Sequence, residues 1–514
     1  MSKKWSKLLV MLVIVLTMVI GLTVVANAQE YGGTAKGVVW SVNTDTGVLN
    51  ISVEGPMGTW TQGSQPWYKH RASITSIEFS QATSHITSYA FSDLYNVKEI
   101  VIPNSVEAID DYAFIGCSSA ELIDIPISVA TWGTKVFNGC VNVSTIITQN
   151  QTDINKDASL WDATVGSSAQ ASGKEVKLIV NSKSIGQYAF YGLSTVTDVT
   201  IPDSLSSIND YAFYGFVSPF SLNLTAASKI GEKAFYGCTG VARINLPVAK
   251  EIGAEAFYGC TAAKEINAPA ATSIGNSAFE NCSAAEKIYI GASNITWGSE
   301  GRYFAGCTSC KELFLGNINF PNNKSVMQNL GRGKEVHMTL GKNISTISTL
   351  HETYVGSGMG KVTLDLEENS QLSSVAANAF KDTSYLKEVD FSNSARGMTF
   401  GANAFNNCAN IEVFSTNTGT LSLTTLAMGN LKKLKTLNWN ASSTNLGWTP
   451  PSIECTRTLS ETKVNSSSKS GQISNVPSQR SSSSYNTYVP TNGAISVTAS
   501  NSFNTIAGTI SYSF

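Results

Sequence analysis

The chain has 514 residues and a formal net charge of −2, and only 14% of its residues are charged. Because it has no basic excess, it lacks the electrostatic footprint of a nucleic-acid-binding protein, and we expect no nucleic-acid partner. Its 41 glycines, with abundant Ser, Thr and Asn, favour tight turns and short strands over long solvated helices. This length accommodates several ordinary domains or one long repeat array.

Residues 1–28 have the pattern of a secretory signal peptide. Three lysines precede an apolar run over residues 8–25, and residues 26–28 read Ala-Asn-Ala, a small-residue cleavage site. The apolar run is also long enough to span a bilayer, so an uncleaved anchor is the alternative. The cleavage site favours removal. We therefore predict a secreted or surface-displayed protein with no stable membrane span after cleavage.

Residues 29–70 alternate apolar and polar side chains in two short runs, VVWSV and VLNISV, separated by Asn43-Thr44-Asp45-Thr46-Gly47. This pattern predicts a β-hairpin. A segment rich in turn formers and tryptophan follows. Since the open end of a repeat array must be covered, we predict that 29–70 is a β-rich N-terminal cap.

Between residues 185 and 282 one phrase occurs five times: IGQYAFYGL, INDYAFYGF, IGEKAFYGC, IGAEAFYGC and IGNSAFENC. Its phenylalanines are 23, 22, 22 and 22 residues apart, at Phe190, Phe213, Phe235, Phe257 and Phe279. A fixed period of this size is typical of a solenoid, whose coils stack and share one core. We predict a solenoid over 71–448, degenerate at 141–184 and 305–375.

Seven of the nine cysteines follow a repeat phenylalanine by three residues: Cys117, Cys140, Cys238, Cys260, Cys282, Cys307 and Cys408. Each therefore holds the same place in its own coil, where a reduced thiol acts as a small buried hydrophobe. A disulfide between adjacent coils is the alternative, because the spacing of coils permits one. Cys307-Thr308-Ser309-Cys310 is a lone CxxC, for which a local disulfide also stays open.

The composition changes after residue 448. Two prolines and two serine runs predict a flexible Ser/Thr-rich linker over 449–514. The alternating stretches ISVTAS and TISYSF near the end predict a short β segment in the form of a hairpin.

The repeated phrase resembles the BspA-like leucine-rich repeat family, on the match of Ile109 to Cys117 (IDDYAFIGC) and Val97 to Pro103 (VKEIVIP). The resemblance covers about residues 30–440. It implies an α/β-type repeat solenoid, a right-handed leucine-rich-repeat superhelix with a parallel β-sheet on one face and turns or 3₁₀ segments on the other. It also implies a secreted or surface protein that binds host matrix proteins or other cells.

The sequence offers no catalytic motif and no metal-ligand spacing around its four histidines. We therefore predict a protein that is not an enzyme and has no cofactor. An enzyme with an unrecognised site in 305–375 is a remote alternative.

Outward-facing residues of the predicted strands form the candidate ligand-binding surface, because alternate side chains point away from the core. Tyr289, Phe314 and His337 are expected side by side on three successive coils, where exposed aromatic residues suit an interface hot spot. The same aromatic stripe could instead pack against itself or under neighbouring loops. The remaining candidates are charged: Arg243, Glu265, Lys287 and Glu312.

We therefore predict a non-catalytic binding or adhesion protein that recognises an extracellular or host protein, a glycan or another cell surface through the sheet face. The alternative is a structural spacer or assembly subunit that displays its C-terminal segment. A second aromatic row, Tyr191, Tyr214, Tyr236 and Tyr258, is predicted to stack and stiffen the array.

Overall fold

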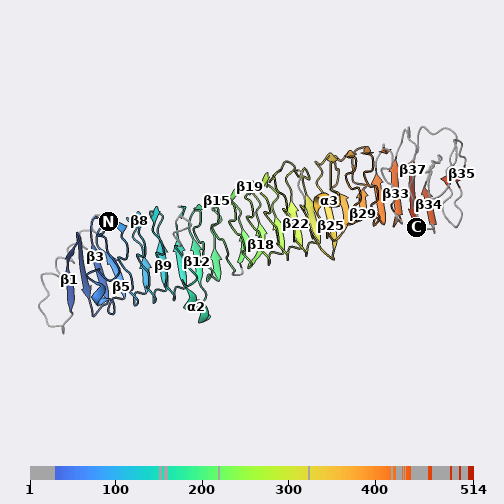
Figure 1. Ribbon diagram of the computed structural model, residues 1–514. Coiled ribbons are helices and arrows are strands. Elements are labelled where there is room, and N and C mark those ends of the chain that lie inside the picture. The colour runs from blue at the N-terminus through green and yellow to red at the C-terminus, as the bar shows by residue number, and fades with distance from the viewer. Residues whose placement is uncertain are drawn as a thin grey trace, which may run out of the picture.

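The computed structural model is an elongated parallel β-solenoid with its first and last strands at opposite ends (Figure 1). It describes residues 29–417 with gaps at 150–152, 155–159, 218–219 and 322–324, then 421–423, 431, 433–434 and the strand segments 436–441, 461–465, 487–488, 497–498 and 508–513. The predicted signal peptide and both serine runs lie outside the described residues.

One broad strand per coil builds the main parallel sheets. They are ordered β14-β12-β11-β9-β7 and β16-β18-β20-β22-β24-β25-β27-β29-β31-β33, so strands that follow one another along the chain are also neighbours in space. The bounds are β5 (Ser76–Phe79), β7 (Glu99–Val101), β9 (Leu122–Ile125), β11 (Thr145–Thr148), β12 (Lys177–Val180), β14 (Asp198–Thr200), β16 (Phe220–Asn223), β18 (Val241–Asn245), β20 (Glu265–Asn267), β22 (Lys287–Ile290), β24 (Glu312–Leu315), β25 (Glu335–Leu340), β27 (Lys361–Leu366), β29 (Leu386–Phe391), β31 (Val413–Asn417) and β33 (Thr436–Ala441).

The opposite side of the solenoid also carries parallel sheets, where the sequence predicted only turns or 3₁₀ segments. Short strands form three narrow ladders, and most of these strands have only two residues. Their bounds are β4 (Gly55–Pro56), β6 (Thr83–Ile86), β8 (Ala108–Ile109) and β10 (Thr131–Trp132); β13 (Ser184–Ile185), β15 (Ser207–Ile208), β17 (Lys229–Ile230), β19 (Glu251–Ile252), β21 (Ser273–Ile274) and β23 (Thr296–Trp297); and β26 (Thr346–Ile347), β28 (Ser374–Val375), β30 (Met398–Phe400) and β32 (Leu421–Leu423).

The turn that carries the repeat phenylalanine alternates between right- and left-handed backbone. In the coil of Phe235, Lys233 has φ 51° and Gly237 has φ 68°. Glycine at the second position avoids the cost of about 1–2 kcal/mol that a side chain pays in this region. The N–H groups of Lys233, Phe235 and Gly237 all donate to carbonyls of the next coil, at 2.9, 2.8 and 2.7 Å. The turns therefore form a hydrogen-bonded ladder with one direction.

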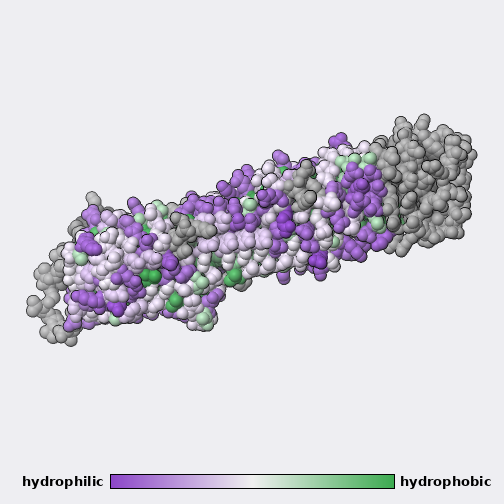
Figure 2. Space-filling model, viewed as in Figure 1, coloured by the Kyte–Doolittle hydropathy of each residue, from purple (hydrophilic) through white to green (hydrophobic). Residues whose placement is uncertain are grey.

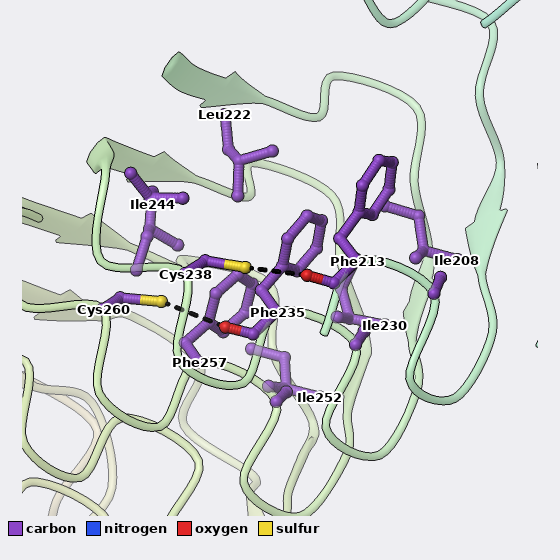
Figure 3. Packing of buried hydrophobic residues seen from close by; sticks show 14 of the residues in the cluster. Ile208, Phe213, Leu222, Ile230, Phe235, Cys238, Ile244, Ile252, Phe257 and Cys260 are labelled. Carbon is purple, nitrogen blue, oxygen red and sulfur yellow. Dashed lines mark hydrogen bonds between the residues drawn. The ribbon is translucent and has the colours of Figure 1, made fainter. Parts of the chain in front are cut away.

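The core consists of stacked identical side chains (Figure 3). Successive phenylalanine rings lie nearly parallel, with centroids 5.1 Å apart for Phe213–Phe235 and 5.2 Å for Phe235–Phe257. Beside them, Cys238 Sγ donates to the Phe213 carbonyl oxygen at 3.1 Å, and Cys260 Sγ donates to that of Phe235 at 3.4 Å. The thiol therefore fills a small apolar place and also satisfies a buried carbonyl group.

The eight cysteines among the described residues are free and buried, as predicted for the reduced ladder. Cys307 donates to the Phe279 carbonyl at 3.3 Å and Cys310 to the Glu312 carbonyl at 3.6 Å, so the CxxC pair forms no disulfide in this structure. Burial raises the pKa of the Cys117 thiol to about 12 and raises that of Cys238 further. At neutral pH these thiols are therefore held protonated, which lowers their reactivity as nucleophiles.

Tryptophan replaces phenylalanine at two breaks in the repeat. Trp161 stacks on Phe137 with centroids 5.0 Å apart, and its Nε1 donates to the Ala189 carbonyl oxygen at 2.9 Å. Trp67 makes the equivalent bond to Ala90 at 2.9 Å. In both places the indole ring packs in the stack as a phenylalanine ring does. Its N–H also donates to the alanine carbonyl that, in a regular coil, accepts from the backbone N–H of the phenylalanine. The described residues contain three short helices, and two of them, η1 (Tyr68–His70) and α2 (Ser167–Ala171), follow these tryptophans; the third is α3 (Glu352–Val355).

Antiparallel strands occur at both ends. The strands β1 (Glu30–Ala35), β2 (Val38–Asn43) and β3 (Val48–Ser52) pair in sequence, and β3 then pairs in parallel with β5. The β2–β3 pair is the predicted hairpin, whereas β1 was not predicted. At the other end, β37 (Gly508–Ser513) pairs antiparallel with both β33 and β34 (Glu461–Asn465), while β35 (Thr487–Tyr488) pairs with β36 (Val497–Thr498). The two final alternating stretches therefore do not pair with each other as expected.

Candidate functional site

Two parallel rows of outward-facing side chains run along the main sheet, because each strand from β16 to β25 presents alternate residues to solvent. The neutral row holds the uncharged members, and neighbouring strands pair them in register: Asn223, Asn245, Asn267, Tyr289, Phe314 and Thr339. The charged row lies two residues earlier on each strand: Arg243, Glu265, Lys287, Glu312 and His337. Each row thus takes one side chain from each coil.

Tyr289 and Phe314 form a stacked aromatic pair in the neutral row. Their ring centroids are 4.5 Å apart and their planes differ by 18°. Tyr289 is 41% exposed, and Phe314 is half-buried. Gly291 makes room for the ring, because a Cβ there would lie 2.7 Å from Tyr289 Cε1. The pair is an apolar platform that stands on an otherwise polar face.

The three asparagines of the neutral row form a chain of amides. Asn245 Nδ2 donates to Asn223 Oδ1 at 2.6 Å, and Asn267 Nδ2 donates to Asn245 Oδ1 at 2.7 Å. An amide has two N–H donors and two acceptor lone pairs, so each of these bonds uses only part of its capacity. The side chains are therefore fixed in orientation and can still bind a ligand.

Ion pairs neutralise the charged row. Arg243 Nη2 lies 3.0 Å from Glu265 Oε1, and Lys287 Nζ lies 2.8 Å from Glu312 Oε2. Glu312 raises the pKa of Lys287, by a hydrogen bond first and by charge second. Because the row is exposed and paired, it adds little stability and presents little net charge.

A groove of about 450 Å³ lies between the two rows over strands β20 to β25. It is lined by Glu265, Ile266, Asn267, Lys287, Ile288, Tyr289, Glu312, Leu313, Phe314, His337 and Thr339. Six of the seven predicted site residues are among them, and Arg243 lies one strand beyond. Figure 2 shows hydrophilic residues spread over the length of the visible face, with hydrophobic residues as small separate spots.

The prediction that His337 lies beside Phe314 was wrong. Thr339 is the register partner of Phe314, and His337 is the partner of Glu312 in the charged row. His337 Nε2 then lies 2.8 Å from Asp365 Oδ2 on the next strand. His337 lies 23 residues after Phe314, which is one regular period, but β24 and β25 pair residues that are 25 apart, and this register places the histidine in the charged row.

Sequence reasoning did not assign Asn267, Thr339 or Asp365 to the site. Asn245 and Asn267 are 22 residues apart, which is the repeat period, so their spacing was a usable signal for the amide chain. No comparable signal pointed to Thr339 and Asp365, because they follow the irregular coil.

The tyrosine row on the turn edge has the predicted stack. Successive ring centroids of Tyr191, Tyr214, Tyr236 and Tyr258 are 5.3, 4.9 and 4.8 Å apart. The stack ends at Glu280, whose nearly buried carboxylate accepts from Arg302 Nε at 2.9 and 3.0 Å. These contacts join coils to one another and serve the fold.

The described residues hold no group of three or more His, Cys, Asp or Glu that could bind a metal ion. None of their helices is both long and apolar enough to cross a bilayer. His85 Nε2 lies 2.8 Å from Asp110 Oδ1 on the narrow-sheet side. We assign this pair no chemistry.

Stacked coils of this kind, with one broad strand and one recurring turn in each, define a leucine-rich-repeat solenoid. The sequence model of the BspA type leucine rich repeat region, present in six copies, matches residues 64–160, 168–249, 228–349 and 359–488. The chain belongs to this family. No curated protein matches it.

Three solved bacterial structures illustrate the similarity. A leucine-rich repeat protein from Bacteroides ovatus is 16% identical, with 80% of this chain and all of that chain covered and a TM-score of 0.37. A leucine rich cell surface protein from Faecalibacterium prausnitzii is 16% identical over 66% of this chain and 96% of that one, with a TM-score of 0.26. The pneumococcal vaccine antigen PcpA is 14% identical over 75% and 93%, with a TM-score of 0.24.

Proposed function

We propose that this protein is a secreted or surface-displayed, non-catalytic binding protein that recognises an extracellular partner through its main sheet face. Membership of the BspA-type repeat family and the predicted signal peptide support export. Membership of a family of repeat proteins also supports a binding role over a catalytic one.

The exposed stack of Tyr289 on Phe314 is the single observation that carries the proposal. Aromatic side chains supply a large contact area at a low cost in conformational entropy, and they dominate the energetics of many interfaces. Here they line a groove whose other wall is a paired, neutralised row of charges. Such a surface favours recognition by contact over long-range electrostatic attraction.

A binding screen tests the proposal. The full chain is offered extracellular-matrix proteins, glycans and whole cells, beside a double variant with Tyr289→Ala and Phe314→Ala. A Tyr95→Ala variant is the matched control, because Tyr95 is 37% exposed and lies outside the groove. We expect saturable binding that the double variant loses by at least tenfold and the control retains.

Binding that survives the double substitution would place the site elsewhere on the molecule. No binding to any partner would overturn the proposal and favour the structural spacer.

A further inference from the structure

We propose that the neutral row binds a linear, uncharged glycan that lies lengthwise along the solenoid. This inference rests on the proposed function, in which the sheet face is the binding surface, and it names the class of ligand. The neutral row crosses six neighbouring strands, from Asn223 to Thr339. At about 4.8 Å between strands it is about 24 Å long, which suits a chain of several sugar units.

The amide chain offers sugar hydroxyls both hydrogen-bond donors and hydrogen-bond acceptors. In the middle of the chain, Asn245 donates to Asn223 and accepts from Asn267, so its amide keeps one free N–H and one free lone pair. A sugar hydroxyl is itself both a donor and an acceptor, and one hydroxyl can use both of these sites. The amides are already oriented by their mutual hydrogen bonds, so little conformational freedom is lost when the ligand binds.

The aromatic pair continues the neutral row in the direction of β25. Sugar rings combine hydroxyl groups at their rims with apolar C–H surfaces, and these surfaces pack against aromatic side chains. Tyr289 adds a phenolic hydroxyl to an apolar ring, which suits a ligand that is partly apolar and partly polar. Amides followed by aromatic rings on one straight row therefore match the two kinds of surface on a glycan.

The charged wall of the groove fits an uncharged ligand. Arg243 is paired with Glu265 and Lys287 with Glu312, each within 3.0 Å, so the wall has no excess of either sign. A sulfated or uronic polysaccharide would have to break these pairs to find cations. The anionic groups of such a polysaccharide would also lie close to the carboxylates of Glu265 and Glu312, which would repel them.

An extended peptide fits this surface less well. Peptides that add a strand to a sheet do so at an exposed edge, where backbone groups are unpaired. The floor of the groove is the middle of a sheet, in which β22 pairs with both β20 and β24. The backbone N–H and C=O groups of a peptide laid across it would depend on side chains alone for hydrogen bonds.

Titration of the full chain with defined oligosaccharides tests the inference. The probes are linear oligomers of glucose, N-acetylglucosamine and mannose of increasing length, with heparin as the acidic comparison and a mixture of extracellular-matrix proteins as the polypeptide comparison. We expect one neutral series to bind, with affinity that rises with chain length until the row is filled. Because no net charge takes part, the dissociation constant should change less than twofold between low and high salt.

Two substitutions connect binding to the row. Asn245→Ala interrupts the amide chain, and Asn267→Asp keeps the shape but removes the N–H donors of that side chain. Each should weaken glycan binding at least tenfold, and Tyr95→Ala should not. Asn245 and Asn267 are only half-buried, and circular dichroism of each variant checks that the fold is retained.

The outcomes separate this inference from the proposed function. Binding of a matrix protein that is lost with Tyr289→Ala and Phe314→Ala, without binding of any neutral glycan, overturns the glycan and leaves the binding face in place. Salt-sensitive binding of heparin alone also overturns it, as does glycan binding that both asparagine variants retain. If no probe of any class binds the face, both the inference and the proposed function are wrong.

Discussion

Substitution of Gly253 by alanine would test how closely the coils approach one another. Its backbone is not in the left-handed region, so the side chain itself brings no conformational strain. A Cβ on Gly253 would lie 2.5 Å from the Glu232 backbone nitrogen and 2.6 Å from the Gly231 carbonyl carbon. Backbone atoms cannot rotate aside as a side chain can. We therefore expect a loss of about 2–3 kcal/mol, the upper part of the range for overpacked cores.

Gly259→Ala in the same coil is the matched control. Gly259 has φ +72°, and a Cβ there would be no closer than 3.8 Å to any other atom. Its cost is therefore strain alone, about 1–2 kcal/mol for a left-handed residue. The lower entropy of the unfolded chain returns about 0.4–1 kcal/mol of this. We expect a net loss of about 1 kcal/mol.

Hydrogen exchange measures both effects at the coil itself. The Gly253 N–H donates to the Ile230 carbonyl at 2.9 Å, and its exchange reports local opening between β17 and β19. Since about 1.4 kcal/mol corresponds to a factor of ten, Gly253→Ala should accelerate exchange by more than about thirtyfold and Gly259→Ala by less than about tenfold. Equal effects would refute the steric argument. They would mean that the coils separate at negligible cost.

Three further predictions concern the core and the ion pairs. Phe257→Ala should cost about 3–5 kcal/mol in urea unfolding, because the ring is fully buried between two stacked neighbours. Burial raises the pKa of the Cys117 thiol from 9.0 to about 12, so the thiol loses its proton at lower pH in the unfolded chain than in the folded one. The folded state therefore gains stability that is fully present below pH 9 and should be lost as the pH rises towards 12. Midpoints of urea unfolding measured across this pH range would show the loss. Arg302→Ala should cost about 2 kcal/mol by leaving the nearly buried Glu280 carboxylate unpaired, whereas Arg243→Ala in an exposed pair should cost less than about 1 kcal/mol in the same melts.

Specific results would contradict each of these. A loss below about 1 kcal/mol for Phe257→Ala would mean that the neighbouring rings close the cavity. Urea midpoints that stay constant between pH 9 and 12 would show that the thiols titrate as they do in water. Equal losses for the two arginine variants would show that the Glu280 carboxylate is solvated.

The repeat made most of the fold predictable. Residues such as Phe235, Cys238 and Tyr236 recur at one period, and in a solenoid equal spacing in sequence becomes direct stacking in space. The strands of the main sheet followed in the same way, since alternate apolar residues must all face one core.

The narrow sheets were not predictable, because a two-residue strand such as β19 contains no alternation. Its pairing depends on the neighbouring coil, which supplies the partner in register. The positions of Trp67 and Trp161 in the stack were not predicted for a related reason. Each occupies the position of the repeat phenylalanine, but the residues around it do not match the repeated motif.

In the candidate site, the repeat period predicts the position of a side chain on the sheet only where the coil has regular length. Arg243, Glu265 and Lys287 follow coils of regular length, and their positions on the sheet were predicted. His337 follows a coil without the repeated phrase, in which the turn is free to add residues. Strand register is set by hydrogen bonding between coils, and the pairing of Phe314 with Thr339, 25 residues further on, leaves His337 in the other row.

The one-way ladder in the turns makes the two ends of the solenoid chemically unlike. A bare N-terminal end would present carbonyl oxygens and a bare C-terminal end would present N–H groups, so two bare ends would fit each other head to tail. An association of that kind does not close on itself and would grow into a filament. Gln65 and Trp67 donate to the carbonyls of Tyr89 and Ala90 at the first coil. These two side chains near the N-terminus occupy acceptors that a second copy would need for such end-to-end association.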